Sequence, residues 1–315
     1  MKIAVLDDYQ GVALELADWT ELAKAAEITV YRDHVSGIDA IVERLLPFDV
    51  VCVMRERTPL CREVLERLPR LKMIASTGPR NASIDMVAAK DRGITVTATG
   101  YSPAPTIELT WALVLASARR IDRESHAVRS GRWQTTVGRE LRGKVLGVLG
   151  LGNIGREVAR IGPAFGMRVV AWSENLTPAI AQAAGATLVG KSDLFRQADV
   201  VTVHLVLSPR TTGLVGASEL ALMKPTAWLV NTSRGPIVEE AALLHALRTR
   251  AIAGAALDVF AEEPLPAQHP FRSLDNVLAT PHVGFVSEEL YRTFYGDVVR
   301  NIGAWITAAQ AAPEG

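Results

Sequence analysis

The sequence predicts an α/β protein made of two doubly wound domains, each built on a parallel sheet. Short apolar runs rich in β-branched residues alternate along the chain with segments of helical periodicity. A glycine-rich turn, Gly150-Leu151-Gly152-Asn153-Ile154-Gly155, follows one such run and opens a helix. The 315 residues suffice for two domains of ordinary size, each with its own core.

The glycine-rich turn has the spacing that a dinucleotide requires. Val145–Leu149 predicts a strand buried on both faces, and apolar residues at helical spacing continue after the turn to Phe165. Gly150 permits a tight turn, Gly152 leaves room for the diphosphate, and Gly155 lets the helix pack on the strand. The N–H groups and positive dipole end of the helix would then face the diphosphate. The motif, with Asn153 and Ile154 inside it, predicts a bound nicotinamide dinucleotide in a Rossmann domain.

The next expected strand, Arg168–Trp172, should end beside the adenosine ribose. An Asp or Glu usually binds the ribose hydroxyls there, but in this chain Ser173 ends the strand and Glu174 follows it. Serine has no charge to repel a 2′-phosphate, and no Arg or Lys follows at once to bind one. Glu174 could serve as the carboxylate instead. Both NAD and NADP are therefore compatible with the sequence, with NAD slightly favoured.

The composition excludes several classes of protein. Lys+Arg 34 balances Asp+Glu 34, which argues against a nucleic-acid or membrane-surface protein. The start of the chain has no basic apolar leader, and no run of 18 apolar residues occurs, so we expect a cytoplasmic protein. Cys52 and Cys61 form neither a disulfide framework nor a zinc pattern, so no metal is expected.

The first domain is expected over residues 1–99. Its strands are predicted at Lys2–Asp8, Ile28–Tyr31, Asp49–Met54, Leu71–Ala75 and Ile94–Val96, and its helices at Val12–Ala26, Asp39–Leu46 and Arg62–Leu68. A loop over 97–105 then breaks all periodicity. One long helix is expected from Thr106 to about Ser130, so apolar near its start that it must be buried between domains or against a second subunit.

The α/β pattern resumes in a second, larger domain over residues 100–285. Further strands are predicted at Val200–Leu205, Ala227–Asn231, Ala253–Leu257 and Val277–Ala279, with helices at Pro178–Ala184, Ser218–Met223 and Glu239–Arg250. If the final helix, Ser287–Ala308, returns to the starting domain, the second domain is inserted into the first.

Three ionisable residues stand just after expected strands, where open α/β sheets bind ligands. They are Arg234, Glu263 and His282. Singly, each has an ordinary explanation as a surface Arg, a solvated loop Glu and a His that caps a turn. Together they suit nicotinamide redox chemistry, because His can exchange a proton with the reacting oxygen and a neighbouring carboxylate favours its protonated form. A guanidinium can hold a substrate carboxylate and polarise the adjacent carbonyl.

Six sequence pieces carry a family resemblance. They are 143–155 (GKVLGVLGLGNIG), 165–167 (FGM), 198–204 (ADVVTVH), 231–235 (NTSRG), 255–260 (AALDVF) and 280–284 (TPHVG). The chain resembles the D-isomer-specific 2-hydroxyacid dehydrogenases, strongly from about Glu108 to Gly284 and more loosely before that. The resemblance implies a flavodoxin-like substrate domain formed by residues 1–99 and 286–315, with the Rossmann domain inserted into it.

The resemblance also implies roles for the site residues. Arg234 would bind the substrate carboxylate, His282 would act as acid/base, and Glu263 would be its partner. Asp258 would lie near the nicotinamide amide. The remaining cofactor contacts implied by the matching pieces are His204, Thr232, Ser233 and Gly284.

In relatives, backbone N–H groups of a glycine loop in the first domain help to hold the carboxylate. Here the loop contains Gly78, Pro79 and Arg80, of which the last two depart from the usual small residues. Pro79 removes one donor. Arg80 either offsets this loss, selects an acidic substrate or is an ordinary exposed side chain. Two more departures from the family pattern concern substrate specificity. One is Arg55 with Glu56 and Arg57 after it, and the other is Phe285 in place of a second glycine after His282.

The reaction expected is hydride transfer between NAD(P) and a D-2-hydroxy acid or 2-keto acid. A dinucleotide-sensing corepressor of the same fold is the alternative, but a sensor needs no intact His–Glu–Arg set. The hypothesis that formate is the substrate has less support, because we find no extension that would build a closed cavity for a small anion. The apolar helix from Thr106, together with Trp133 in the segment that follows, predicts a homodimer.

Overall fold

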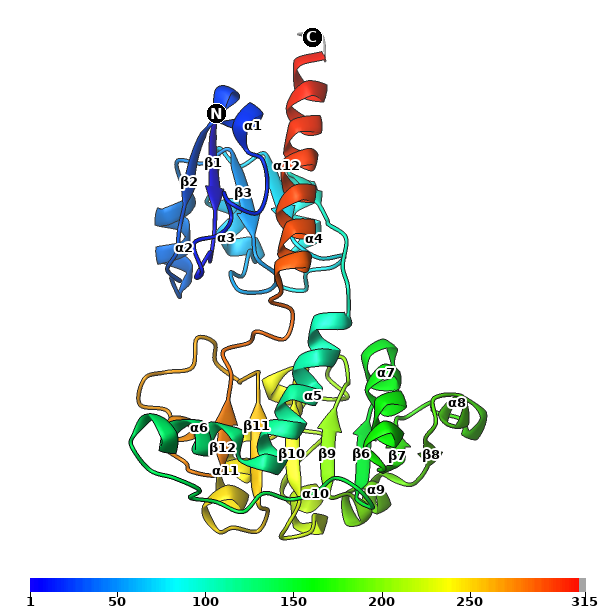
Figure 1. Ribbon diagram of the computed structural model, residues 1–315. Helices are drawn as coiled ribbons and strands as arrows, with labels where there is room; N and C mark the ends of the chain where they lie inside the picture. The colour runs from blue at the N-terminus through cyan, green and yellow to red at the C-terminus, as the bar shows by residue number, and fades with distance from the viewer. Residues whose placement is uncertain (312–315) are drawn as a thin grey trace. The chain divides into compact units, whose positions relative to one another are not determined.

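The computed structural model describes residues 1–311, and the chain divides into two compact units (Figure 1). Unit 1 comprises Met1–Ser102 and the segment that begins at Val286, and unit 2 comprises Pro103–Phe285. The chain therefore passes from unit 1 to unit 2 after Ser102 and returns to unit 1 after Phe285. The sequence analysis expected these two boundaries after residues 99 and 285. Each unit contains one parallel sheet, as the sequence predicts.

Unit 1 has a five-stranded parallel sheet in the order β2-β1-β3-β4-β5, which is the flavodoxin-like order. Its strands are β1 (Lys2–Val5), β2 (Glu27–Val30), β3 (Val50–Val53), β4 (Met73–Ser76) and β5 (Thr95–Thr97). Its helices are α1 (Thr20–Ala25), α2 (Ile38–Leu45), α3 (Arg62–Glu66), α4 (Met86–Asp91) and α12 (Glu288–Ala311).

Side chains along each strand alternate between the two faces of this sheet, and helices pack against the sheet. Ala4, Val51 and Ile74 belong to a buried cluster with side chains from α2, α3 and α4. The helix α12 packs against β4 and α1, and Phe294 and Val298 on it are fully buried. The last helix thus contributes to the core of unit 1, which contains segments from both ends of the sequence.

Unit 2 has a seven-stranded parallel sheet in the order β12-β11-β10-β9-β6-β7-β8. Read from β6, this is the Rossmann order with one strand added at the far edge. The strands are β6 (Val145–Leu149), β7 (Arg168–Trp172), β8 (Thr187–Leu188), β9 (Val200–Val203), β10 (Trp228–Asn231), β11 (Gly254–Leu257) and β12 (Val277–Ala279).

The helices of unit 2 lie on the two faces of this sheet. They are α5 (Ala104–Arg119), α6 (Ile121–Arg129), α7 (Asn153–Ile161), α8 (Pro178–Ala183), α9 (Lys191–Gln197), α10 (Ala217–Leu222) and α11 (Glu240–Arg248), with 3-10 turns at Gly162–Phe165, Gly235–Ile237 and Pro270–Arg272. Val145 and Leu149 of β6 pack in a cluster with α9, α10 and α11, whereas Leu146 and Val148 pack with α5, α7 and α8. This alternation confirms a strand buried on both faces.

The single helix expected from Thr106 to Ser130 is wrong, because the chain forms two helices, α5 and α6. Arg120 separates them in a left-handed conformation with φ of 55°, and its N–H bonds the carbonyl of Ala116. Its guanidinium carbon lies 4.8 Å from the centre of the Trp228 ring. The left-handed residue ends α5 and turns the chain, so α6 starts in a new direction with Asp122 and Glu124 in its first turn.

The helix expected at Val12–Ala26 is shortened to α1, which begins at Thr20. The side chain of Asp8 accepts the N–H groups of Val12 and Ala13, and the Trp19 indole donates to the Ala13 carbonyl at 2.9 Å. These bonds hold the segment in turns. The short elements α4, β8 and α9 are absent from the sequence expectation, and several strands end earlier than expected, β9 at Val203 instead of Leu205.

Candidate active site

The glycine-rich turn lies where the order of the sheet reverses, between β6 and β9. A Cβ on Gly150, which has a φ of 98°, would lie 2.5 Å from the carbonyl oxygen of His204. A Cβ on Gly155 would lie 2.0 Å from the Gly150 carbonyl oxygen. These two glycines are thus required by the protein itself, because backbone occupies the space of a side chain.

Gly152 differs, since a Cβ there would meet nothing within 4 Å. It is the N-cap of α7, and no side chain caps that helix end. Both Gly152 and Asn153 are exposed. The residues present therefore fit a dinucleotide: the open space beside Gly152 leads to the N-terminal N–H groups and positive dipole end of α7.

Three polar side chains follow β7 and β9, the strands on either side of β6. Ser173 is partly buried and Glu174 is exposed directly after β7. The ring Nε2 of His204 lies 2.8 Å from the Thr202 hydroxyl, and burial lowers the pKa of His204 to about 3. His204 is therefore neutral at physiological pH and adds no charge beside the diphosphate site.

The turn after β10 is shaped by Asn231, a buried side chain that the sequence expectation did not include. Its Oδ1 accepts the Ser233 N–H and its Nδ2 donates to the Arg234 carbonyl, both at 3.0 Å. The Ser233 hydroxyl donates to the Val203 carbonyl, and the Thr232 hydroxyl lies 2.8 Å from that of Thr110. The hydroxyls expected to contact the cofactor thus also fix the loop that carries Arg234.

Glu263 and His282 meet although they are 19 residues apart. The Glu263 Oε2 lies 2.5 Å from the Nδ1 of His282, and the two side chains are 31% and 23% exposed. The Glu263 Oε1 accepts the backbone N–H of Phe260 at 2.8 Å, which orients the carboxylate. Within residues 1–311, the Nε2 of His282 makes no hydrogen bond, so this atom is the one left to face a ligand.

The electrostatics of this pair favour an ionised carboxylate. Burial alone would raise the pKa of Glu263, but the hydrogen bond and charge of His282 act in the opposite direction. The Phe260 N–H and the charge of Arg234 act in the same direction, so the pKa of Glu263 is held below its usual range. Arg234, Glu263 and His282 thus form one electrostatically linked set in unit 2.

Asp258 holds the loop that carries His282. Its Oδ1 accepts the Thr280 hydroxyl at 2.7 Å and the Val283 N–H at 2.9 Å, while its Oδ2 accepts the Gly284 N–H at 2.8 Å. A Cβ on Gly284 would come within 2.9 Å of that Oδ2, so glycine is needed for the approach. His282 itself takes a left-handed backbone conformation with φ of 52°.

Burial raises the pKa of Asp258 above its usual range, although the donors from the His282 loop and the charge of His282 act in the opposite direction. Its carboxylate is occupied by protein donors, whereas the resemblance implies a contact with the nicotinamide amide. Little in the sequence indicates that Asp258 binds the His282 loop. The only signals are a lone Asp after β11 and the small residue Gly284 two positions after His282.

The glycine loop of unit 1 follows β4 and is tightly engaged. The Gly78 N–H donates to the Thr99 hydroxyl at 2.7 Å, and Pro79 has no N–H. The Arg55 guanidinium covers Gly78, because a Cβ there would lie 1.6 Å from the Arg55 Nη1. That Nη1 donates to the carbonyls of Thr77 and Arg80 at 3.2 and 3.4 Å. The exposed Arg80 side chain has no hydrogen bond or ion pair among residues 1–311.

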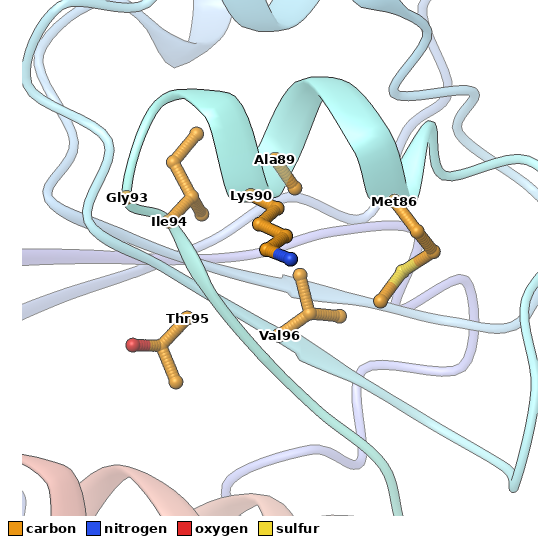
Figure 2. A pocket seen from close by; sticks show the side chains of 7 residues that line it. All are labelled: Met86, Ala89, Lys90, Gly93, Ile94, Thr95 and Val96. Atoms are coloured by element: carbon orange, nitrogen blue, oxygen red, sulfur yellow. The ribbon is translucent and has the colours of Figure 1, made fainter.

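A pocket in unit 1 lies apart from this loop (Figure 2). It is lined by α4 and by the entry into β5, with Lys90 as its one charged side chain. Thr95, in its wall, is the first residue of β5, so the pocket lies toward the amino end of that strand. Ligands of open α/β sheets bind beyond the carboxyl ends, which sets this pocket outside the candidate site.

Two further features are absent from the described part of the chain. No group of three or more His, Cys, Asp and Glu side chains within residues 1–311 is arranged to hold a metal ion. Over the same range, none of the helices combines the length and the apolar content needed to cross a membrane.

Comparisons with known proteins agree with this architecture. The family model of the D-isomer specific 2-hydroxyacid dehydrogenase NAD-binding domain matches residues 111–284. A glyoxylate reductase of Aeropyrum pernix is 45% identical over 237 residues, which cover 72% of this chain and 71% of that protein. A D-3-phosphoglycerate dehydrogenase of Methanocaldococcus jannaschii is 39% identical over 295 residues, covering 92% of this chain but only 54% of that protein.

A solved structure shows the same likeness in space. The crystal structure of a phosphoglycerate oxidoreductase from Vibrio cholerae has a TM-score of 0.92 and 36% sequence identity, covering 98% of this chain and 99% of that one. The family model includes the glycine-rich turn, Arg234, Glu263 and His282 within its match. The chain therefore belongs to the D-isomer specific 2-hydroxyacid dehydrogenase family of NAD-dependent oxidoreductases and contains that family's NAD-binding domain.

Proposed function

We propose that this chain transfers a hydride between NAD and a D-2-hydroxy acid or its 2-keto acid, with His282 as acid/base, Glu263 as its partner and Arg234 as the substrate-carboxylate binder. The observation that carries the proposal is the 2.5 Å contact between Glu263 and the Nδ1 of His282, with Nε2 left for a ligand. A dinucleotide sensor would not require this pair.

His282 and Glu263 have different tasks in the proposed mechanism. When bound, the cofactor supplies or accepts the hydride at its nicotinamide ring. In the direction of reduction, the protonated Nε2 of His282 donates its proton to the carbonyl oxygen, and in oxidation the neutral Nε2 accepts it back. The ionised Glu263 accepts the Nδ1–H in both states, which fixes the tautomer and stabilises the imidazolium.

Arg234 is proposed to bind the substrate carboxylate through two parallel N–H donors and to polarise the adjacent carbonyl. Its backbone is fixed through the Asn231 side chain, and its Nη1 donates to the Ser233 carbonyl at 2.7 Å. This anchoring supports a guanidinium that is oriented before substrate arrives. The geometry limits the conformational entropy lost on binding.

The loop of unit 1 is proposed to contribute to substrate selection. Gly78 and Pro79 offer no uncommitted backbone donor, so anion binding there would fall to the side chains of Arg55 and Arg80. Arg55 is ion-paired with Glu56 at 3.6 Å, so Arg80 is the cation that would favour a keto acid with a second anionic group. The names of the relatives include substrates of both kinds, since glyoxylate has one anionic group and 3-phosphoglycerate has two.

Two further proposals concern the cofactor and the assembly. Glu174 after β7 favours NAD over NADP, because a carboxylate repels a 2′-phosphate. A homodimer is supported by Trp133 and Val137, which are 77% and 94% exposed. The apolar side chains of α5 no longer support it, since Trp111 and its neighbours are buried in the core of unit 2.

A substrate panel tests the proposed function. Purified protein would be mixed with NADH or NADPH and with glyoxylate, hydroxypyruvate, phenylpyruvate or 3-phosphohydroxypyruvate, and oxidation followed at the nicotinamide absorbance. We expect keto-acid-dependent oxidation of NADH with D-configured products. Binding of NADH with no turnover on any 2-keto acid would refute the enzyme in favour of a sensor.

A further inference from the structure

Phe285 follows the His282 loop at the point where the chain leaves unit 2. Its side chain is only 7% exposed. The centre of its ring lies 5.6 Å from the centre of the His282 imidazole, and the two ring planes meet at 82°. Aromatic pairs prefer this edge-to-face arrangement at such a distance. The sequence has a bulky residue at this position where the resemblance predicts a second glycine.

The other contacts of His282 do not fully fix the orientation of its imidazole ring. Asp258 fixes the backbone through the N–H groups of Val283 and Gly284. Glu263 fixes a single ring atom, Nδ1. The imidazole is held covalently through Cγ and by one hydrogen bond at Nδ1, so coupled changes in χ1 and χ2 can still swing the ring over the range of angles that this bond tolerates. Such a swing would move Nε2, the atom that exchanges the proton.

We infer that Phe285 is a positioning residue that packs against the imidazole of His282 and holds its Nε2 in the direction of the reacting oxygen. The inference rests on the proposed role of His282 as acid/base. Proton transfer requires the two heavy atoms to approach to hydrogen-bond distance, and a misplacement of about 1 Å can cost about 100-fold in rate. Glycine at this position would leave the imidazole without this ring contact.

A double-mutant cycle tests the inference directly. Phe285→Leu keeps an apolar side chain but removes the ring, and Phe285→Tyr keeps the ring. Each would be made in the parent and in His282→Asn, with kcat, KM and the NADH dissociation constant measured for one keto acid of the panel. We expect Phe285→Leu to lower kcat about tenfold with little change in KM, a loss of about 1.4 kcal/mol. Phe285→Tyr should stay within about twofold of the parent.

The cycle then separates action through His282 from independent action. In the His282→Asn background, Phe285→Leu should change the residual kcat by less than about twofold, because the group that it positions is gone. The solvent isotope effect on kcat should rise in Phe285→Leu alone, since proton transfer becomes slower relative to the other steps. Phe195→Leu is the matched control: this buried residue of α9 should lower the melting temperature and leave kcat unchanged.

Three outcomes would overturn the inference. Equal losses from Phe285→Leu in both backgrounds would show that the ring acts independently of His282. A KM that changes with the size of the substrate side chain, at constant kcat, would place the ring against the substrate instead. An unchanged kcat in Phe285→Leu would show that the ring positions nothing. If His282→Asn itself retained full turnover, the proposed function would fail first, which distinguishes the two hypotheses.

Discussion

Replacing Glu263 by Gln removes the charge beside His282 while keeping the shape of the side chain. The protonated imidazole then loses its anionic partner, so less free energy stabilises the protonated form. Reduction of a keto acid requires the protonated form, and its rate should therefore begin to fail at a lower pH than in the parent. Oxidation of the hydroxy acid requires the neutral form and should hold its rate further into acid.

The size of the shift follows from the contact itself. The Nδ1···Oε2 distance is 2.5 Å, which places the two delocalised charges about 4 Å apart. Such a pair interacts by about 1 kcal/mol in water and about 4 kcal/mol at an effective dielectric constant of 20. Because the side chains are 23% and 31% exposed, solvent screens the pair toward the lower figure. An energy of about 1–2 kcal/mol corresponds to a displacement of the limbs of the pH–rate profile by about one pH unit.

The assay is a pH–rate profile of kcat/KM in both directions for the parent and the Glu263→Gln variant. Glu262→Gln is the matched control, because Glu262 is the exposed neighbour and the variant changes the same charge. The control should reproduce the parent profile. The reasoning fails if the reduction limb of Glu263→Gln stays in place or moves to higher pH, because Glu263 would then not be the partner of His282.

Four further expectations follow from the described geometry. Gly155→Ala should destabilise the protein without cofactor by about 1–3 kcal/mol in denaturant melts, because its Cβ would meet the Gly150 carbonyl, whereas Gly152→Ala should keep that stability and weaken NADH binding. Arg234→Lys should lower kcat/KM about 100-fold and leave NADH affinity intact, since lysine cannot form the paired contact; an equal loss of NADH affinity would contradict the role. Arg80→Gln should lower kcat/KM more for keto acids with a second anionic group than for glyoxylate, and equal losses would mean that Arg80 selects nothing. Val137→Glu should convert a dimer to monomers in sedimentation velocity, and a parent protein that sediments as a monomer at micromolar concentration would refute the homodimer.

Much of the fold could be predicted because its signals are local. The apolar run Val145–Leu149 and the glycine turn after it are contiguous in sequence, and the structure forms both there. The break at Arg120 could not be predicted, since neither glycine nor proline marks it and its contact with Trp228 joins residues 108 positions apart. The same holds for residues 12–19, where the Asp8 side chain replaces a helix by turns.

The site shows the same division between local and distant signals. Arg234, Glu263 and His282 could be named because each follows an expected strand, and the topology of parallel strands gathers such ends. The binding of the His282 loop by Asp258 could not be derived from the sequence. It depends on the direction of two backbone N–H groups, which follow a residue, His282, with a left-handed backbone conformation. Phe285 departs from the resemblance in the sequence itself, but only its ring geometry suggests a reason for the departure.

The interrupted path of the chain has a consequence for its synthesis. Unit 2 is continuous in sequence, so all its strands are available before Val286 is made. Unit 1 lacks the helix that fills one face of its sheet until α12 emerges, with Phe294 and Val298 among the residues it buries. A growing chain can thus complete the inserted unit while the surrounding one still exposes apolar surface. Of the two units, the one whose synthesis begins first would thus finish folding last, and chaperone binding should concentrate on residues 1–102 during that interval.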